Sequence, residues 1–398
     1  KKSSRYQGII MKKLSKTAMN IDGQPMFKVL DKVKALEDLG REILHFEIGD
    51  PDFPTPDNIV QAACGALGKG WTHYISSLGL PEFRQKICQA TKRSRGFEPH
   101  IDQVLATPGA NIAIFYAMYC LMDPGDEVIV PDPGFPTYYS TAKMCGMVPV
   151  RIPLKEENYF RMNPDDVAKR ITPKTRLIIV NSPQNPTGSV MTQDEMKAIY
   201  QLAEKNDLYI YSDEIYSRMI YDENNFSTPS IYDECKKRTI VSNGFSKAFA
   251  MTGWRLGAVI GPKEVVERFG MLLQTTSSCV APFLQIAGIE AIEGDQSEVK
   301  EMMKKYRERR DLVVSGFNAI PNISCVRPGG AFYAFVNIKR TGMSSERIVD
   351  YLLENAGVAV LPGSSFGKYG DDFIRFCYAS SKENIQRGLD RIKNSLTV

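Results

Sequence analysis

The chain has 398 residues, of which 43% are hydrophobic and 24% are charged, and its formal net charge is +4. This length favours two domains, and the composition is typical of a soluble globular protein. The net charge is too small for a chain of this size to indicate a nucleic acid or a membrane as a partner. The eight cysteines lack CxxC spacing and the three histidines lie far apart. We therefore expect no metal site, no disulfide framework and a reduced, cytoplasmic protein.

The first part of the chain, residues 1–54, contains one short apolar run from Gly8 to Met11 near its start. This run is too short for a signal peptide or a membrane span. We expect residues 1–54 to pack with a small domain formed by the end of the chain.

Residues 55–290 alternate short apolar segments with helical stretches, which is the pattern of an α/β domain. The apolar segments are rich in β-branched residues, so the sequence predicts a mostly parallel, mixed sheet that helices cover on both faces. Strands are expected at 103–106, 127–130, 177–180, 208–211, 239–241 and 257–260, and helices at 111–122, 164–170 and 193–206.

Four of these strands are followed by polar or glycine-rich clusters, at residues 107–111, 131–136, 181–188 and 212–216. Open α/β sheets bind ligands outside the carboxyl ends of their strands. A single cluster would be an ordinary turn, but four of them predict one binding site at this edge of the sheet.

Residues 291–398 have a different sequence pattern, which predicts a smaller α+β domain. Long charged helices are expected at 297–317, 344–355 and 382–395, and strands near 330–335 and 373–376. The basic run at 304–310 is interpreted as the solvated face of a helix.

Lys247 is the most informative residue of the chain. It lies between two expected strands, in a segment of small and apolar residues. Desolvation there disfavours the ammonium form, so the free amine can attack a carbonyl and form a Schiff base. Arg255, eight positions later, supplies a fixed positive charge for a phosphate. Together they suit pyridoxal 5′-phosphate, although a single lysine is more often a solvated surface charge.

Two motifs make this hypothesis specific, SKAFAMTGWRLG at 246–257 and NPTG at 185–188. With them the chain resembles the fold-type I, class I pyridoxal-phosphate-dependent aminotransferases, in particular the bacterial and archaeal aspartate, alanine and aromatic aminotransferase-like branch. The resemblance extends from Gly49 to Arg375. It implies a cytoplasmic homodimer that moves an amino group from an L-amino acid to a 2-oxo acid.

The resemblance also implies roles for individual residues around the cofactor. Lys247 would form the imine with the cofactor aldehyde and then carry the proton. Asp213 would pair with the pyridine nitrogen, Tyr216 and Asn185 would bond the ring oxygen, and Phe135 would stack on the ring. The phosphate would be held by Gly109, Ala110, Asn111, Ser246 and Arg255, together with Tyr74 of the neighbouring subunit. Many relatives carry a further serine where this chain has Gly244, so one phosphate contact is expected to be missing.

The substrate carboxylate is assigned by the resemblance to Arg375, with further contacts from Gly49 and Asn185. Some aspartate-specific relatives carry a lysine where this chain has Asn111, which favours a neutral or aromatic amino donor here. Two alternatives share the same residues, namely a lyase, cyclase or oxidase that uses the same cofactor, and a non-catalytic protein that senses it.

Overall fold

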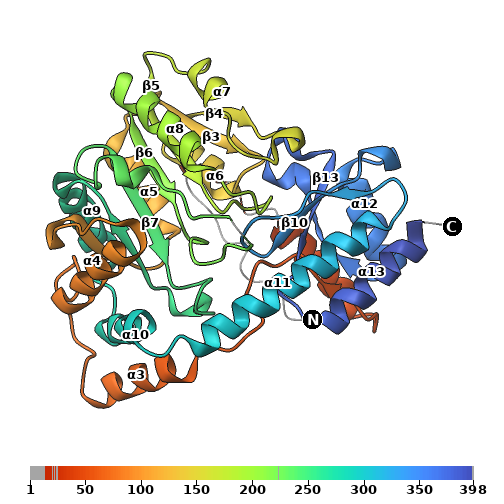
Figure 1. Cartoon of the computed structure of the whole chain (residues 1–398), viewed down its shortest axis with the longest axis horizontal. Helices are drawn as coiled ribbons and strands as arrows, with labels where there is room; N and C mark the ends of the chain where they lie inside the picture. Colours follow the sequence, from red (N-terminus) through yellow and green to blue (C-terminus); the bar gives the residue numbers. More distant parts are fainter. Residues whose placement is uncertain (1–13, 20, 22, 24–25, 223, 397–398) are drawn as a thin grey trace.

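The computed structural model describes residues 14–396 except residues 20, 22, 24, 25 and 223. Its larger sheet has seven strands in the order β2-β8-β7-β6-β5-β3-β4 (Figure 1). β8 runs antiparallel to both of its neighbours, whereas the other pairs are parallel, so six strands point the same way. The strands are β2 (Val104–Thr107), β3 (Glu127–Asp132), β4 (Val148–Pro153), β5 (Thr175–Asn181), β6 (Tyr209–Asp213), β7 (Thr239–Gly244) and β8 (Gly257–Ile260).

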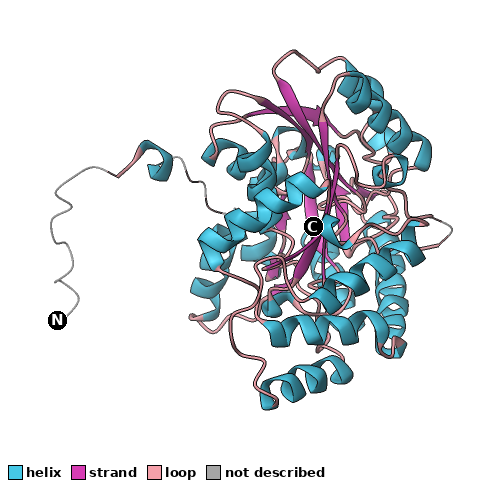
Figure 2. Ribbon diagram, turned by 90° about the vertical axis from the view of Figure 1, so that its left-hand side faces the viewer, coloured by secondary structure: helices cyan, strands magenta, loops and turns pink. Residues whose placement is uncertain are grey.

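Helices cover both faces of this sheet (Figure 2). The sequence predicted this cover from the apolar strands. The structure agrees, since strands such as β5 are buried almost throughout. One helix, α8, shows how the local sequence sets a boundary. Thr192 and Glu195 form a reciprocal capping box at its start. The helices around the sheet are α3 (Asp57–Gly68), α4 (Pro81–Arg95), α5 (Ile112–Leu121), α6 (Pro136–Met144), α7 (Pro164–Ala168), α8 (Gln193–Lys205), α9 (Lys263–Ser277) and α10 (Pro282–Glu293).

A second, antiparallel sheet has the strand order β12-β13-β10-β9 and belongs to the C-terminal part of the chain. A separate parallel pair joins β1 to β11. These elements are β1 (Leu44–His45), β9 (Ser324–Cys325), β10 (Tyr333–Asn337), β11 (Val358–Ala359), β12 (Leu361–Pro362) and β13 (Phe373–Cys377). The helices of the two chain ends are α1 (Lys16–Met19), α2 (Met26–Glu37), α11 (Ser297–Asn318), α12 (Ser345–Tyr351), which continues into a π-helical turn at Leu352–Ala356, and α13 (Lys382–Leu396).

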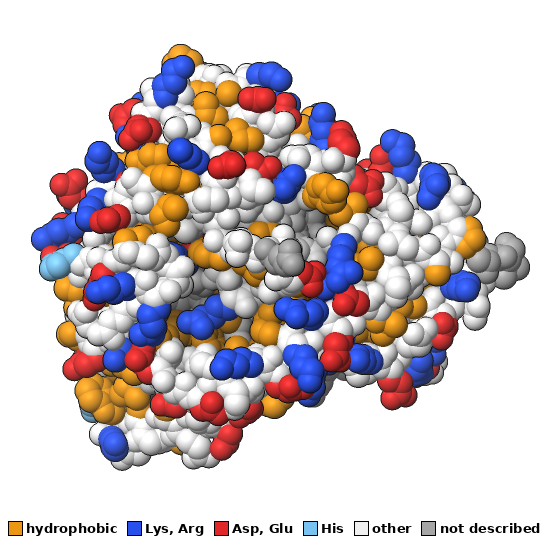
Figure 3. All heavy atoms as spheres, in the orientation of Figure 1, with side chains coloured by type: hydrophobic (Ala, Val, Ile, Leu, Met, Phe, Trp, Pro, Cys, Tyr) orange, Lys and Arg blue, Asp and Glu red, His pale blue; other side chains and the backbone are white. Residues whose placement is uncertain are grey.

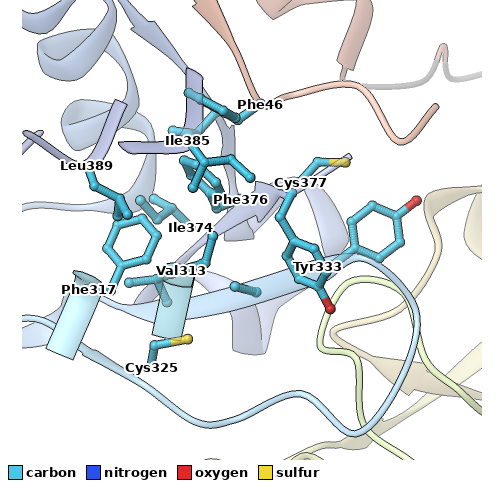
Figure 4. Packing of buried hydrophobic residues seen from close by; sticks show 14 of the residues in the cluster. Phe46, Val313, Phe317, Cys325, Tyr333, Ile374, Phe376, Cys377, Ile385 and Leu389 are labelled. Carbon is cyan, nitrogen blue, oxygen red and sulfur yellow. The ribbon is translucent and has the colours of Figure 1, made fainter. Parts of the chain in front are cut away.

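The core beside this sheet joins residues that are far apart in sequence (Figure 4). Phe46 stacks on Phe376 of β13 with ring centroids 4.2 Å apart, and Phe317 of α11 meets the same ring edge-on at 5.2 Å. The backbone of Phe46 also bonds Ala359 and Cys377 on two different strands. The segment before residue 50 is therefore fastened to the C-terminal sheet. The domain boundaries at residues 55 and 291 stay a prediction.

One expectation from the sequence differs from the structure, and one strand of the larger sheet was not predicted. The basic run in α11 is not solvated throughout, since Arg309 and Arg310 are buried. Arg309 forms a two-point ion pair with Asp52, and Arg310 does the same with Asp222. The strand β4 was not predicted, because its sequence contains two prolines. It lies at the edge of the sheet, where a missing backbone N–H is tolerated.

Candidate active site

A cavity of about 500 Å³ opens at the carboxyl-end edge of the larger sheet. The segments after β2, β3, β5, β6 and β7 all reach this edge, because these strands point the same way. The cavity brings together most of the site residues that the sequence predicted, namely Gly49, Ala110, Asn111, Phe135, Asn185, Asp213, Tyr216, Ser246, Lys247, Arg255 and Arg375. The four polar clusters and the lysine segment thus form one site.

Lys247 extends from the segment after β7 into this cavity. Its Nζ donates a hydrogen bond to the carbonyl oxygen of Gly49 at 2.5 Å and lies 5.7 Å from the ring centre of Phe332. Burial lowers the pKa of the Lys247 amine to about 8, and the nearby Asp50 offsets only part of this effect. A substantial fraction of the amine is therefore neutral near pH 8, as a nucleophile or a base requires.

The lowered pKa predicts a pH-dependent stability for the cofactor-free protein. The unfolded chain keeps the ordinary lysine pKa of 10.5, so the folded state carries a disfavoured charge below pH 8 and loses this penalty between pH 8 and 10.5. We expect Lys247→Met to raise the free energy of unfolding at pH 7 by up to about 3 kcal/mol, and the gain to vanish near pH 10.5. Urea unfolding at both pH values measures this, with exposed Lys69→Met as control. A gain independent of pH would contradict the prediction.

Asp213 lies buried at the end of β6 and faces the same cavity. The hydroxyl of Tyr138 donates to its Oδ2 at 2.6 Å, and the backbone N–H of Ile215 donates to its Oδ1 at 3.3 Å. Burial raises the pKa of the Asp213 carboxyl to about 6, while the bond from Tyr138 acts in the opposite direction. At neutral pH the group is mostly an anion in a fixed orientation, which suits a cationic ring nitrogen.

The segment between β2 and α5 lies beside Arg255 and forms a polar end of the cavity. Gly109 has a φ of +80°, and a Cβ at this position would lie 2.5 Å from Nη2 of Arg255. Only glycine allows this close approach. The backbone N–H groups of Ala110 and Asn111 have no acceptor in the part of the chain that the structure describes. Free amides at a helix start beside a guanidinium form a fitting cradle for a phosphate.

Gly244 lies close to two apolar side chains. A Cβ there would lie 2.8 Å from Cδ1 of Ile215 and 3.4 Å from Cβ of Ala110. A serine at position 244 would require the Ile215 side chain to shift. Ser246 is the serine of this segment that lines the cavity.

Arg375 on β13 enters the cavity from the C-terminal part of the chain and is buried. Its guanidinium lies 4.5 Å from the ring centre of Tyr333 and donates to Oδ1 of Asn185 at 3.2 Å and to the carbonyl oxygen of Glu47. Its Nε is buried without a partner in the described structure. The planar group is thus fixed in place with donor capacity to spare, which is what a carboxylate ligand needs.

A family model described as aminotransferase class I and II matches residues 41–392. The chain belongs to this family. It is 41% identical over 371 residues to the aspartate aminotransferase of Pyrococcus horikoshii, covering 93% of each chain. It is 38% identical over 373 residues to aromatic-amino-acid aminotransferase 2 of Thermococcus litoralis, covering 93% of this chain and 94% of that one. The solved structure of the alanine aminotransferase from Pyrococcus furiosus superimposes with a TM-score of 0.93 and 33% identity, covering 96% and 99% of the two chains.

The predicted family, fold and reaction type are thereby confirmed, and the chain is an aminotransferase that depends on pyridoxal phosphate. The cavity fits this cofactor. Its lining contains a buried carboxylate, a partly neutral lysine, and a guanidinium beside free backbone amides. The family match favours transamination over the lyase, cyclase, oxidase and sensor alternatives.

Two predicted residues, Gly109 and Tyr74, do not line this cavity. Gly109 lies directly beside the lining residue Arg255, whereas Tyr74 is 86% exposed on the chain surface. No helix in the described part of the aminotransferase is both long and apolar enough to cross a membrane.

Five polar residues that line the cavity were not predicted from the sequence, namely Asp50, Tyr138, Asn181, Thr252 and Tyr333. The hydroxyl of Tyr333 lies 2.7 Å from that of Tyr216, and its ring supports Arg375. Asn181 donates from its side chain to the carbonyl oxygen of Asp213 at 3.1 Å. Asn181 could have been found as the polar residue that ends its strand. Tyr138 and Tyr333 lie in apolar contexts that resemble ordinary core positions.

Proposed function

We propose that Lys247 is the catalytic base and acid of this aminotransferase and that the cavity around it binds both the cofactor and the amino acid. The observation that carries this proposal is the convergence of a partly neutral amine, a buried carboxylate and two guanidinium groups on one cavity. When bound, pyridoxal phosphate supplies an electron-withdrawing ring that stabilises negative charge at the α-carbon of the substrate. The protein supplies the position of each group and the proton transfer.

Lys247 is proposed to accept the proton from the substrate α-carbon and to donate it again in a later step. A pKa of about 8 lets this amine both accept and donate a proton efficiently near neutral pH. Gly49, whose carbonyl oxygen accepts the bond from Nζ, would hold the amine on the substrate side of the cavity.

The remaining cofactor contacts are proposed from the same geometry. Asp213 would keep a ring nitrogen protonated, and Phe135 would cover a ring face. Tyr216 and Asn185 would donate to the ring oxygen. The phosphate would bind at the polar end formed by Gly109, Ala110, Asn111, Ser246 and Arg255.

Arg375 is proposed to bind the substrate α-carboxylate, with Asn185 beside it. Replacement by alanine should lower kcat/KM for amino acids by about 2–4 kcal/mol, or roughly 30- to 1,000-fold, because one half of a buried ion pair is removed. Steady-state kinetics measure this, and the absorbance of the bound cofactor should stay unchanged as a control for an intact site. An unchanged kcat/KM would remove Arg375 from this role.

We propose a neutral or aromatic L-amino acid as donor and a 2-oxo acid as acceptor. Among the described residues, the cations that line the cavity are Lys247, Arg255 and Arg375, and each already has a proposed partner. The other walls include Phe27, Ile48, Ile114, Ile215 and Tyr333. A screen of amino donors against several oxo acids tests the proposal, and a kcat/KM for aspartate above those for alanine and phenylalanine would contradict it.

We further propose that the enzyme is a cytoplasmic homodimer in which Tyr74 contacts the cofactor phosphate of the neighbouring subunit. The exposure of this aromatic side chain and the eight free cysteines support these two points. A hydrogen bond to a charged group contributes about 1.5–3 kcal/mol, so Tyr74→Phe should weaken cofactor binding about 10- to 100-fold. Equilibrium titration with pyridoxal phosphate measures this.

Mixed dimers test whether the contact crosses between subunits. Combining Tyr74→Phe chains with Lys247→Ala chains should restore active sites of normal cofactor affinity, because one site of each hybrid has both native residues. If mixing restores no such sites, Tyr74 does not act across the interface.

A further inference from the structure

A second cavity, of about 430 Å³, lies between α4, the segment after Tyr216 and β7. It shares no lining residue with the active site. The face of the molecule in Figure 3 carries interspersed acidic and basic side chains, and Lys and Arg side chains border a hollow over the region of α4, α10 and β7. The lining residues of the second cavity include three arginines, Arg93, Arg95 and Arg218, and no acidic residue.

Two of these arginines are neutralised by acidic partners. Arg93 pairs with Glu293 at 2.6 Å, and Nε of Arg95 donates to the buried carboxylate of Glu214 at 3.1 Å. Arg218 has neither a hydrogen bond nor an ion pair to another residue that the structure describes. It lies instead over the ring of Phe249, with 5.2 Å between the guanidinium carbon and the ring centre.

The position of Arg218 leaves its charge without compensation. Arg218 lines the cavity but is exposed to solvent, so partial desolvation lowers the pKa of its guanidinium, and Arg95 and Arg93 act in the same direction. It therefore lies beside like charges in a cavity whose lining has no acidic residue. Because its partner is an aromatic ring and not a carboxylate, its N–H donors stay available to an anion.

A hydroxyl and an apolar wall complete the cavity. Ser217 accepts a hydrogen bond from Asn243 at 3.0 Å, and its own hydroxyl hydrogen has no acceptor among the described residues. The lining also includes the apolar side chains of Phe226, Phe245 and Ile292. The guanidinium of Arg95 lies 5.1 Å from the ring centre of Phe226. Charged donors and aromatic walls are therefore close together.

We propose that this second cavity is a binding site for an organic carboxylate that carries an apolar group, with Arg218 and Ser217 as the donors to the carboxylate. A simple inorganic anion would satisfy the charge but leave the aromatic wall in water. A neutral apolar ligand would cover the wall and leave Arg218 without a counter-charge. A ligand with both parts satisfies the whole cavity.

Calorimetric titration of the cofactor-loaded enzyme with phenylacetate tests this site. The titration uses the Arg375→Ala background, so that the carboxylate clamp of the active site does not contribute. We expect one phenylacetate per chain, and at least tenfold weaker binding when Arg218→Met is added. Arg340→Met, which changes an exposed arginine of the C-terminal part, should alter the affinity less than twofold.

Inorganic phosphate and benzylamine, which each offer one half of the proposed chemistry, should bind at least tenfold more weakly than phenylacetate. With native Arg375, the single Arg218→Met enzyme should keep its cofactor absorbance and a kcat/KM within twofold of the native value, which shows an intact fold. Phenylacetate binding that persists after Arg218→Met, or phosphate binding of equal strength, would overturn the proposal.

Discussion

Replacement of Lys247 by alanine is expected to lower kcat for transamination by about 10⁴-fold, the largest effect of any single change in this chain. The substitution removes the lysine amine of the cavity, which we propose carries the α-proton. It leaves the phosphate end and Arg375 unchanged. Amino acid should therefore still bind while turnover stops, and single-turnover absorbance measurements separate the two.

Partial rescue gives this experiment its control. Added small primary amines should restore some turnover to the alanine variant, because they can enter the space that the lysine vacates. Lys69→Ala, a change at an exposed lysine, should have no effect. Turnover of the Lys247→Ala enzyme within tenfold of the native rate would show that another group moves the proton.

Asp213→Asn is expected to produce the second-largest loss. The substitution keeps the shape of the side chain and removes its charge, so the bound ring nitrogen loses its anionic partner. Removing one member of a buried charge pair costs about 2–5 kcal/mol, which corresponds to a decrease in kcat of roughly 30- to several-thousand-fold. Tyr138 would still hydrogen-bond the amide, so the fold of the site should survive.

The control for this change is Asp207→Asn, at a carboxylate whose side chain is 98% exposed and paired only at the surface. Its kcat should remain within twofold of the native value. If Asp213→Asn were equally mild, the carboxylate would have no part in stabilising charge on the ring.

Much of the larger sheet was predictable from sequence, because its strands are continuous apolar runs bounded by polar or glycine-rich segments. The predicted segment 257–260 coincides with β8, and the others differ from the structure by a few residues at their ends. Those ends are where the structure extends strands into polar residues such as Asn181 and Asp213. Residues that line the cavity therefore belong to the strand ends that hydrophobic patterning leaves out.

The site was predictable where a residue type has few other uses in its context, as with Lys247 and Arg375. It was not predictable where a side chain acts through a neighbour. Tyr333 packs against Arg375 and contacts Tyr216, and no local sequence pattern predicts either contact. The same reason explains Arg309 and Arg310, whose acidic partners Asp52 and Asp222 are distant in the chain.

The central claim is that Lys247 binds the cofactor covalently. Borohydride reduction of the cofactor-loaded enzyme, followed by peptide mass spectrometry, tests this claim most directly. Reduction should fix one pyridoxyl group per chain, on the peptide that contains Lys247. A pyridoxyl group on another lysine, with Lys247 unmodified, would contradict the account.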